Sequence, residues 1–323
     1  MSSKPSSINM NSRNLWSEDI KDSVDFYNKW FLHFAPIVYR QQRGRAIRMI
    51  EEIFNHTNNL TNISADVLRQ YPDIFRVLRL ATAPPLAKDR VEGLSGVSKN
   101  LIKRLEDGEL PTRMKPSELT GGLESVAKTL ETLLDKDVFS WLVLNTIPSE
   151  VEKARAASVL GDRLCSSLAD PLIRNEQERR QLDTICKILN QYGYSQVASS
   201  SIVSIKNFPR HCYAIHYNVQ MNLGADGKVN TPIDLAVKSQ YAQEDSLPIL
   251  IECKSAGDFT NVNKRRKEEA TKMQQLKATF GEDISFVLFL CGYFDYGYLE
   301  YEAAEGIDWI WEHRAEEILK LGL

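Results

Sequence analysis

Apolar side chains recur at helical spacing through much of the N-terminal half of the chain. Residues 24–42 are strongly apolar, with aromatic side chains at roughly helical spacing. Within residues 116–144, Leu123, Val126 and Leu130 follow one another at the spacing of an amphipathic stripe. These patterns predict a mostly helical N-terminal part.

A last helix of this part is expected just before the pattern changes. Asn175 is a favourable N-cap residue, and Glu176 and Glu178 would place acidic side chains in the first helical turn. We expect Gly193 to end the helix, because glycine readily adopts the left-handed conformation found at many helix ends.

The pattern of apolar and polar residues changes after Tyr194. Short runs rich in Val, Ile and Tyr alternate with turn residues, which is typical of β-strands. A fully apolar run at 284–294 predicts a strand that is buried on both faces. The other expected elements are strands within 195–205, 211–221, 231–239 and 247–255, and helices at 260–280 and 306–322.

These two patterns predict an α/β fold class with a two-part organisation. A mostly helical N-terminal module precedes a core that consists of a mixed central sheet flanked by helices. The expected boundaries are a disordered tail at 1–14, the helical module at 15–170 and the α/β core at 171–323.

Composition narrows the class of protein further. No apolar run approaches the roughly 20 residues that a membrane helix needs, and the polar N-terminus lacks the apolar segment of a secretion signal. We therefore expect a cytoplasmic protein without a membrane partner. The five cysteines form no CxxC pair, so we expect reduced thiols in the core. Because the net charge is −3, a surface for a polyanion must come from local clusters of cations.

One group of charged residues lies where apolar residues are expected. Asp234 is embedded in a predicted strand, and Glu252 and Lys254 end the next one, directly after the apolar run at 247–251. Residues i and i+2 of a strand point to the same face, so the three side chains converge if the two strands are neighbours. Two carboxylates suit Mg²⁺, and a lysine beside them could orient or help deprotonate a water, or offset the charge of a phosphate. The alternative is a solvated strand end.

These residues carry a resemblance to a known group of enzymes. The segments "TPID" (231–234) and "IECK" (251–254) resemble the motif of the PD-(D/E)xK nuclease superfamily, with Pro232 one place earlier than in the superfamily's Pro-Asp pair. Residues 93–113, 251–272 and 288–314 are similar to the XamI-like type II restriction endonucleases.

The resemblance implies a restriction-endonuclease-like core and Mg²⁺-dependent cleavage of both strands of DNA, which leaves 5′-phosphate ends. It also implies a homodimer and, in the same system, a DNA methyltransferase that protects the host. Asp234 and Glu252 would be the metal ligands and Lys254 the catalytic lysine. In related nucleases a further acid on a neighbouring helix can face the metal. Glu176 or Glu178 could fill that role or remain a solvated first turn, and Glu268 is a weaker candidate.

Two segments are candidates for contact with DNA. The helix after the Glu-x-Lys strand begins with a basic run, which we expect to contact phosphates through some of its members. Residues 89–113 look like the second half of a helix-turn-helix, whose helix start would enter the major groove. The alternatives are a solvated charged face and an ordinary helical hairpin. The candidate residues are Asn261, Asn263, Lys264, Arg265 and Arg266 in the first segment, Ser98, Lys99 and Asn100 in the second, and Arg43 and Arg45 for the DNA backbone.

Two rival functions stay open at this point. One is another nuclease of the same superfamily, which acts in repair or on DNA junctions. The other is a non-catalytic helix-turn-helix DNA-binding protein with a decayed core. The presence of Asp234, Glu252 and Lys254 together disfavours decay.

Overall fold

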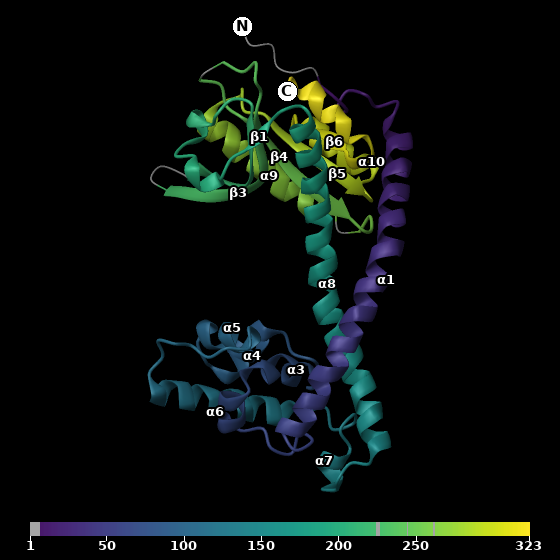
Figure 1. The fold of residues 1–323 in the computed structure, drawn as a ribbon, viewed down its shortest axis with the longest axis vertical. Helices are drawn as coiled ribbons and strands as arrows, with labels where there is room; N and C mark the ends of the chain where they lie inside the picture. Colours follow the sequence, from purple (N-terminus) through teal and green to yellow (C-terminus); the bar gives the residue numbers. More distant parts are fainter. Residues whose placement is uncertain (1–6, 224–226, 244, 261) are drawn as a thin grey trace. The chain divides into compact units, whose positions relative to one another are not determined.

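The structure is a computed structural model that describes residues 7–223, 227–243, 245–260 and 262–323. The chain divides into two compact units, which Figure 1 draws as ribbons. The sheet unit contains residues 1–34 and 174–323, and the helical unit contains residues 35–173. The fold class is α/β, with a helical region followed by a mixed sheet and its helices, as the sequence predicted.

Two long helices belong in part to each unit. They are α1 (Trp16–His56) and α8 (Glu150–Gln191), and each contains a proline, Pro36 and Pro171 respectively. The prediction that Asn175 caps a helix is wrong, because α8 passes through it without a break. The turns before Asn175 bury leucines at helical spacing, and this packing decides the helix start rather than one favourable cap residue.

The helical unit has its own hydrophobic core. The stripe predicted within residues 116–144 is confirmed, since Leu123, Val126 and Leu130 are all fully buried. The helices of this unit besides α1 and α8 are α2 (Ala65–Gln70), α3 (Phe75–Leu80), α4 (Lys88–Ser95), α5 (Lys99–Glu106), α6 (Pro116–Leu133) and α7 (Trp141–Leu144), with a 3₁₀ turn at Pro72–Ile74.

A short turn joins α4 to α5 inside this unit. Gly96 follows α4 with φ 64°, a left-handed conformation that favours glycine. The Ser98 side chain then accepts a hydrogen bond from the Leu101 N–H, at 3.3 Å, and caps α5. The helix buries Leu101, Ile102 and Leu105, which leaves its first residues at the surface.

The described residues of the sheet unit form one sheet of six strands in the order β1 to β6. The pairs β2–β3 and β3–β4 are antiparallel, whereas β1–β2, β4–β5 and β5–β6 are parallel. The sheet is therefore mixed. Its strands are β1 (Ser195–Gln196), β2 (Cys212–Leu223), β3 (Gly227–Lys238), β4 (Ile249–Ala256), β5 (Phe286–Gly292) and β6 (Asp308–Trp311).

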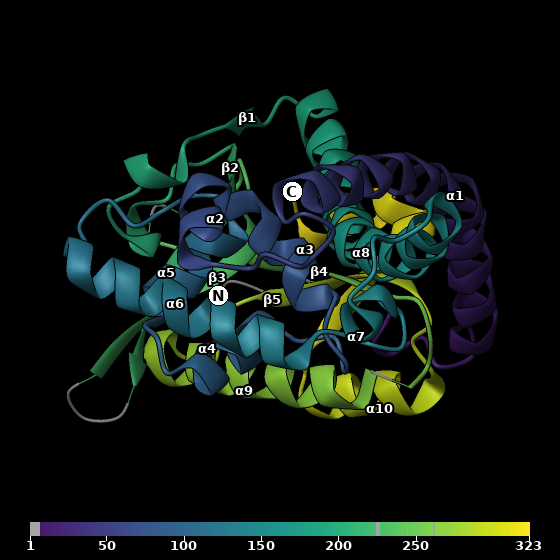
Figure 2. The ribbon, with the colours of Figure 1, turned by 90° about the horizontal axis from the view of Figure 1, so that it is seen from below.

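Helices cover both faces of this sheet, and Figure 2 shows them on opposite sides of the strands. The C-terminal part of α8 packs on one face through residues such as Ile185 and Leu189. On the other face, α9 (Val262–Phe280) packs through Met273 and Leu276, and α10 (Tyr296–Ala304) packs through Leu299. Every residue of β5 is buried between the two layers, as its apolar sequence predicted.

Two predicted elements of the sheet unit are wrong. Residues 306–322 do not form one helix, because β6 occupies their first part and a 3₁₀ helix, Glu312–Leu321, follows. An apolar run that is buried on both faces has no period that separates a strand from a helix, and Trp309, Ile310 and Trp311 are all fully buried. Of the strand expected within 195–205, only β1 forms, followed by 3₁₀ turns at Ser199–Ser201 and Ile205–Asn207.

Residues 7–14 belong to the segment 1–14 for which we expected disorder, and part of this segment is hydrogen-bonded to the sheet; residues 1–6 lie outside the described part. The Asp308 carboxylate accepts hydrogen bonds from the backbone N–H groups of Ile8 at 2.6 Å, Asn9 at 3.0 Å and Met10 at 2.9 Å. Ile8 and Asn9 are buried. The Asp308 carboxylate on β6 thus fixes the start of the described chain to the sheet, together with hydrogen bonds of the Asn9 side chain to Trp309 and Glu317.

Two acidic side chains are buried between α9 and α10. Glu269 of α9 is 2% exposed and Glu302 of α10 is 0% exposed. Burial, and then the charge of Glu269, raises the pKa of Glu302 to about 9. Glu302 is therefore protonated at neutral pH in the folded chain, and the two side chains together bury one negative charge rather than two.

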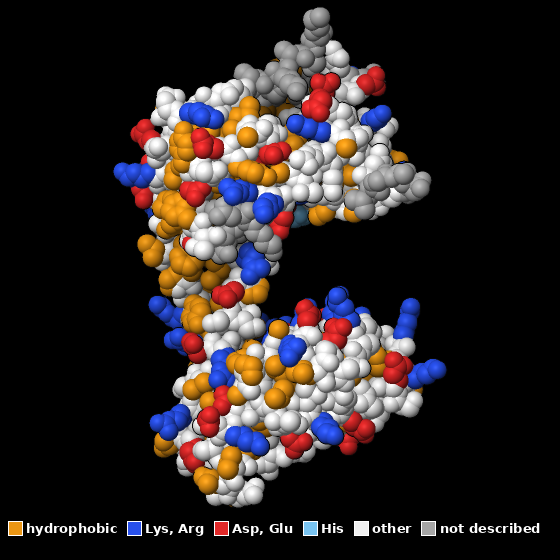
Figure 3. Space-filling model, turned by 180° about the vertical axis from the view of Figure 1, so that it is seen from behind, with side chains coloured by type: hydrophobic (Ala, Val, Ile, Leu, Met, Phe, Trp, Pro, Cys, Tyr) orange, Lys and Arg blue, Asp and Glu red, His pale blue; other side chains and the backbone are white. Residues whose placement is uncertain are grey.

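The surface carries charges of both signs. On the face shown in Figure 3, basic and acidic side chains are interspersed over the described residues. In the described part of the chain, none of the helices combines the length and the apolar composition that a membrane crossing requires.

The Asp308 carboxylate leads to a prediction about stability. Asp308→Ala leaves three backbone N–H groups of residues 8–10 without their acceptor, which should lower the free energy of unfolding by about 2–3 kcal/mol. It should also open residues 7–14 to proteolysis. Chemical denaturation and limited proteolysis measure both effects, with the exposed Asp283→Ala as the matched control. An unchanged unfolding free energy in Asp308→Ala contradicts the interpretation.

The buried Glu302 leads to a prediction about pH. The unfolded chain releases this proton near pH 4.5, whereas the folded chain holds it to about pH 9. The contribution to stability is therefore fully present below pH 4.5 and is lost as the pH rises toward 9. Glu302→Gln keeps a neutral side chain at every pH, so its unfolding temperature should exceed that of the wild type by about 2–4 °C at alkaline pH and by less under acidic conditions. Thermal unfolding at both pH values measures this, and an equal difference at both would refute it.

Candidate active site

The candidate site lies where strands β3 and β4 part. Their pairing ends at Leu235 and Ile251, so Asp234 and Glu252 are the next residues in the register. Beyond this point the backbones of β3 and β4 are no longer paired. There the Asp234 side chain links the two strands, because its Oδ2 accepts a hydrogen bond from the Cys253 N–H at 2.7 Å. The two carboxylates are thereby brought to one place.

Lys254 completes the group predicted from the sequence. It lies two residues after Glu252 on the same face of β4, and its Nζ is 3.0 Å from Glu252 Oε1. Asp234, Glu252 and Lys254 therefore converge at the junction of two neighbouring strands. The alternative, a solvated strand end, does not describe Glu252, which is 7% exposed.

Burial shapes the electrostatics of these side chains. Burial, and then the neighbouring Glu252 carboxylate, raises the pKa of Asp234 to about 6. Burial lowers the pKa of Lys254, but the charges of Glu252 and Glu269 outweigh it and leave this pKa above its usual value. Lys254 is therefore an ammonium group at neutral pH.

Helix α9 adds two residues that the sequence analysis missed. Lys272 Nζ is 2.8 Å from Glu252 Oε1. Glu269 Oε1 is 3.7 Å from Lys254 Nζ, and Glu269 Oε2 accepts a hydrogen bond from the Tyr298 hydroxyl at 2.6 Å. Glu269 and Lys272 lie three residues apart and so share one face of the helix. That spacing was visible in the sequence, but nothing in it indicated that this face meets the strand with Glu252.

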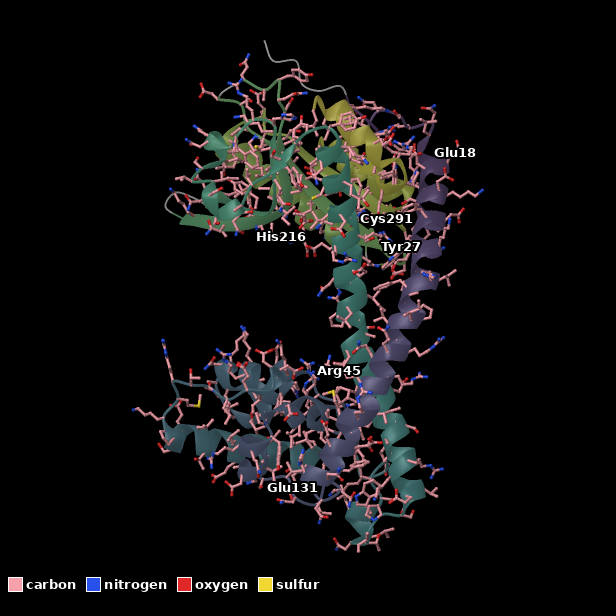
Figure 4. The ribbon with its side chains drawn as sticks, in the orientation of Figure 1. Glu18, Tyr27, Arg45, Glu131, His216 and Cys291 are labelled. Carbon is pink, nitrogen blue, oxygen red and sulfur yellow. The ribbon has the colours of Figure 1, made fainter. Side chains whose placement is uncertain are left out.

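His216 also lies beside the site, although the sequence analysis gave it no role. It occupies the register position on β2 opposite Asp234, where the pairing of β2 with β3 is interrupted. Its φ of 49° is uncommon for a residue other than glycine and marks local backbone strain. Its Nδ1 is 3.8 Å from Glu178 Oε1, and Figure 4 labels it in the sheet unit. No pattern in the sequence predicts such a backbone conformation.

The candidates for a third acid differ in their surroundings. Glu176 forms an ion pair with Arg179. The charge of Glu178, two residues further on, contributes to the raised pKa of Asp234, which places Glu178 nearer the site. Glu268 is exposed on α9, next to the buried Glu269. Since neighbouring helix positions point in different directions, Glu269 rather than Glu268 faces the strands.

The candidate DNA contacts on α9 are described only in part. Asn261 lies outside the described residues, as do the side chains of Asn263, Lys264 and Arg265. Arg266 is half-buried, and its guanidinium lies 5.0 Å from the ring centre of Tyr301 on α10. Arg266 therefore faces the neighbouring helix, and its expected role at the phosphates stays a prediction without support from this contact.

The candidates in the helical unit lie at its surface. Ser98, Lys99 and Asn100 are exposed at the start of α5. Arg43 is exposed, and its Nη2 lies 3.9 Å from Asp162 Oδ1. Arg45, labelled in Figure 4, lines a hollow of this unit together with Arg76, Arg79 and Lys88, among other residues. Contact of any of these residues with DNA stays a prediction.

The carboxylates meet the chemical needs of a divalent cation. Glu252 Oε2 is buried, and among the described residues it has no hydrogen-bond partner. An orphaned oxygen beside a second carboxylate of raised pKa is a place where a bound cation lowers the energy of both groups. The described residues hold no cluster of three or more His, Cys, Asp or Glu side chains arranged around a metal. Two carboxylates with several waters is the arrangement that Mg²⁺ commonly takes.

Comparison with known proteins identifies relatives. The sequence model of the family "XamI restriction endonuclease" matches residues 58–311. The type II restriction enzyme SalI of Streptomyces albus G is 44% identical over 315 residues, which cover 98% of this chain and 99% of that enzyme. Among solved structures, protein VC1899 from Vibrio cholerae has a TM-score of 0.28 and 10% identity, over 86% of this chain and about half (54%) of that protein. This last likeness is too weak to carry an argument.

The family match spans most of the chain, and SalI matches along nearly the full length of both proteins. The chain therefore belongs to the XamI restriction endonuclease family and is a type II restriction endonuclease.

Proposed function

We propose that this endonuclease hydrolyses one phosphodiester bond in each strand of a short DNA site, with Mg²⁺, and leaves 5′-phosphate and 3′-hydroxyl ends. The observation that carries the proposal is the convergence of Asp234, Glu252 and Lys254 at the end of the β3–β4 pairing. Two carboxylates that can hold a divalent cation, with an ammonium group beside them, suit the hydrolysis of a phosphodiester.

In this proposal Asp234 and Glu252 hold the ion. Asp234 is fixed by the hydrogen bond from the Cys253 N–H, and Glu252 offers its unpartnered Oε2. When bound, Mg²⁺ supplies positive charge that stabilises the phosphate as its charge grows, and it makes water more acidic. Both carboxylates lie on adjacent, paired strands, so their separation is set by the sheet rather than by a mobile loop.

Lys254 acts on the phosphate and on the attacking water. Its raised pKa favours the ammonium form, which donates hydrogen bonds and cannot serve as the base. We therefore assign Lys254 to orienting the water and offsetting the negative charge that develops on the phosphate. Among the roles that the sequence left open for this lysine, its charge favours orienting the water and offsetting the charge of the phosphate over deprotonating the water.

Recognition of DNA is assigned to the exposed start of α5 and to the arginines of α1. Ser98, Lys99 and Asn100 begin a capped helix after a tight turn, which is the geometry of a groove-reading helix. Arg43 and Arg45 would contact the DNA backbone.

The chain carries one such group of catalytic residues among its described residues, whereas cleavage of both strands needs one for each strand. We therefore propose a symmetric homodimer. Because the enzyme would also cut the genome of its host, we expect a DNA methyltransferase that protects the same sites.

The first prediction for this site concerns its residues. Lys254→Ala and Asp234→Ala should each lower the rate of cleavage by about 10³-fold or more, because each removes a charge that the reaction needs. Binding of DNA should remain within about threefold, since neither residue is assigned to recognition. Single-turnover cleavage and a gel-shift assay measure the two quantities, and the exposed Lys187→Ala is the matched control. Cleavage at the wild-type rate by either variant would contradict the catalytic role assigned to that residue.

The second prediction concerns the metal. EDTA should abolish cleavage, and added Mg²⁺ should restore it, whereas Ca²⁺ should support binding without cleavage. A plasmid digest should give discrete bands, and their loss after methylation of the DNA separates restriction from a repair activity. Cleavage that persists in EDTA contradicts the assignment of Asp234 and Glu252 as metal ligands.

A further inference from the structure

The buried face of α9 holds charges that the proposed mechanism does not use. Glu269 is 2% exposed, and its Oε1 lies 3.7 Å from the ammonium group of Lys254. Its other oxygen accepts a 2.6 Å hydrogen bond from the hydroxyl of Tyr298, which is fully buried on α10. Burial of a charged group is costly unless the group is paired, and the Lys254 ammonium group is an ion-pair partner for this carboxylate.

Charges of opposite sign alternate through the site. Lys272 and Lys254 both contact Glu252 Oε1, at 2.8 Å and 3.0 Å, and Lys254 in turn pairs with Glu269. Lys254 therefore has two carboxylate partners. If Glu252 binds a cation, as proposed above, the ion pair between Glu252 and Lys254 weakens. The ion pair between Glu269 and Lys254 is not affected in this way.

We propose that Glu269 is a positioning residue that holds the ammonium group of Lys254 at the reacting phosphate when Glu252 binds the metal. This inference rests on the proposed function of Lys254. Glu269 does not touch the substrate in this proposal, and its effect on the reaction passes through the lysine.

The contacts distinguish this role from that of a metal ligand. The described polar contacts of the Glu269 carboxylate are the Lys254 ammonium group, the Tyr298 hydroxyl and the neighbouring Glu302 carboxyl group. Its Oε2 is occupied by the tyrosine, and its Oε1 faces the lysine. Glu269 on α9 thus pairs with Lys254, while Glu252 on β4 remains the proposed metal ligand.

Glu302 provides a control inside the same buried pair. It lies beside Glu269 but is protonated at neutral pH, so a glutamine at this position has almost the same charge and shape. Of these two acids, Glu269 is the one that forms an ion pair with Lys254, at 3.7 Å. The two acids are equally buried, so loss of packing would affect both variants alike.

The experiment compares Glu269→Gln, Glu302→Gln and the exposed neighbour Glu268→Gln in single-turnover cleavage with saturating Mg²⁺. Glu269→Gln should lower the cleavage rate by about 10- to 100-fold, the usual cost of removing a group that orients a catalytic residue. Its dissociation constant for DNA in Ca²⁺ should stay within about threefold of the wild type. Glu302→Gln and Glu268→Gln should cleave within about threefold of the wild-type rate.

Three outcomes overturn the proposal: wild-type cleavage by Glu269→Gln, equal losses of rate in Glu269→Gln and Glu302→Gln, or a loss confined to DNA binding. If Glu269→Gln does not fold, Tyr298→Phe decides, because it removes the donor to Glu269 Oε2 and should lower the rate by about 3- to 10-fold without weakening DNA binding. An unchanged rate in Tyr298→Phe then overturns the proposal. The proposed function is tested separately: Lys254→Ala that cleaves at the wild-type rate contradicts it, whatever Glu269→Gln does.

Discussion

The site depends on the place where the ladder between β3 and β4 stops. The Cys253 N–H loses its partner strand there and still needs an acceptor, because a buried backbone donor without one is costly. The Asp234 carboxylate accepts that hydrogen bond and is fixed beside Glu252. Since a shift of one residue would turn each side chain to the opposite face, the register of the whole sheet decides whether the two acids meet.

Bringing two carboxylates into a buried sheet has an electrostatic cost, which the raised pKa of Asp234 expresses. The chain offsets it with cations from two elements, Lys254 on β4 and Lys272 on α9. Glu269 then pairs with Lys254 as its second carboxylate partner. Buried charges are tolerated when each is paired with a charge of opposite sign. Removal of one partner is therefore strongly destabilising, because it leaves the other charge buried and unpaired. The charges form one network, and α9 is as much a part of it as the strands.

Local patterns in the sequence were enough to place Asp234, Glu252 and Lys254, because their positions follow from strand periodicity and from the pairing of consecutive strands. The capped turn before α5 followed from Ser98 and Gly96 in the same way. The contributions of Glu269 and Lys272 did not, since they depend on how α9 is rotated against the sheet. Burial also overrode local signals: α8 continues through Asn175, and a run that looked helical forms β6.

The basic run after β4 shows why charge alone is a poor guide to contact with DNA. A helix distributes consecutive residues around its axis, so one segment can serve several surfaces. In α9 the described side chains do so: Arg266 turns to Tyr301, Lys272 to Glu252, and Lys267 stays at the surface. The described cations of this helix therefore divide between the interior and the solvent. Lys272 turns inward and holds the Glu252 carboxylate, so a basic run in the sequence is not by itself one continuous surface for phosphates.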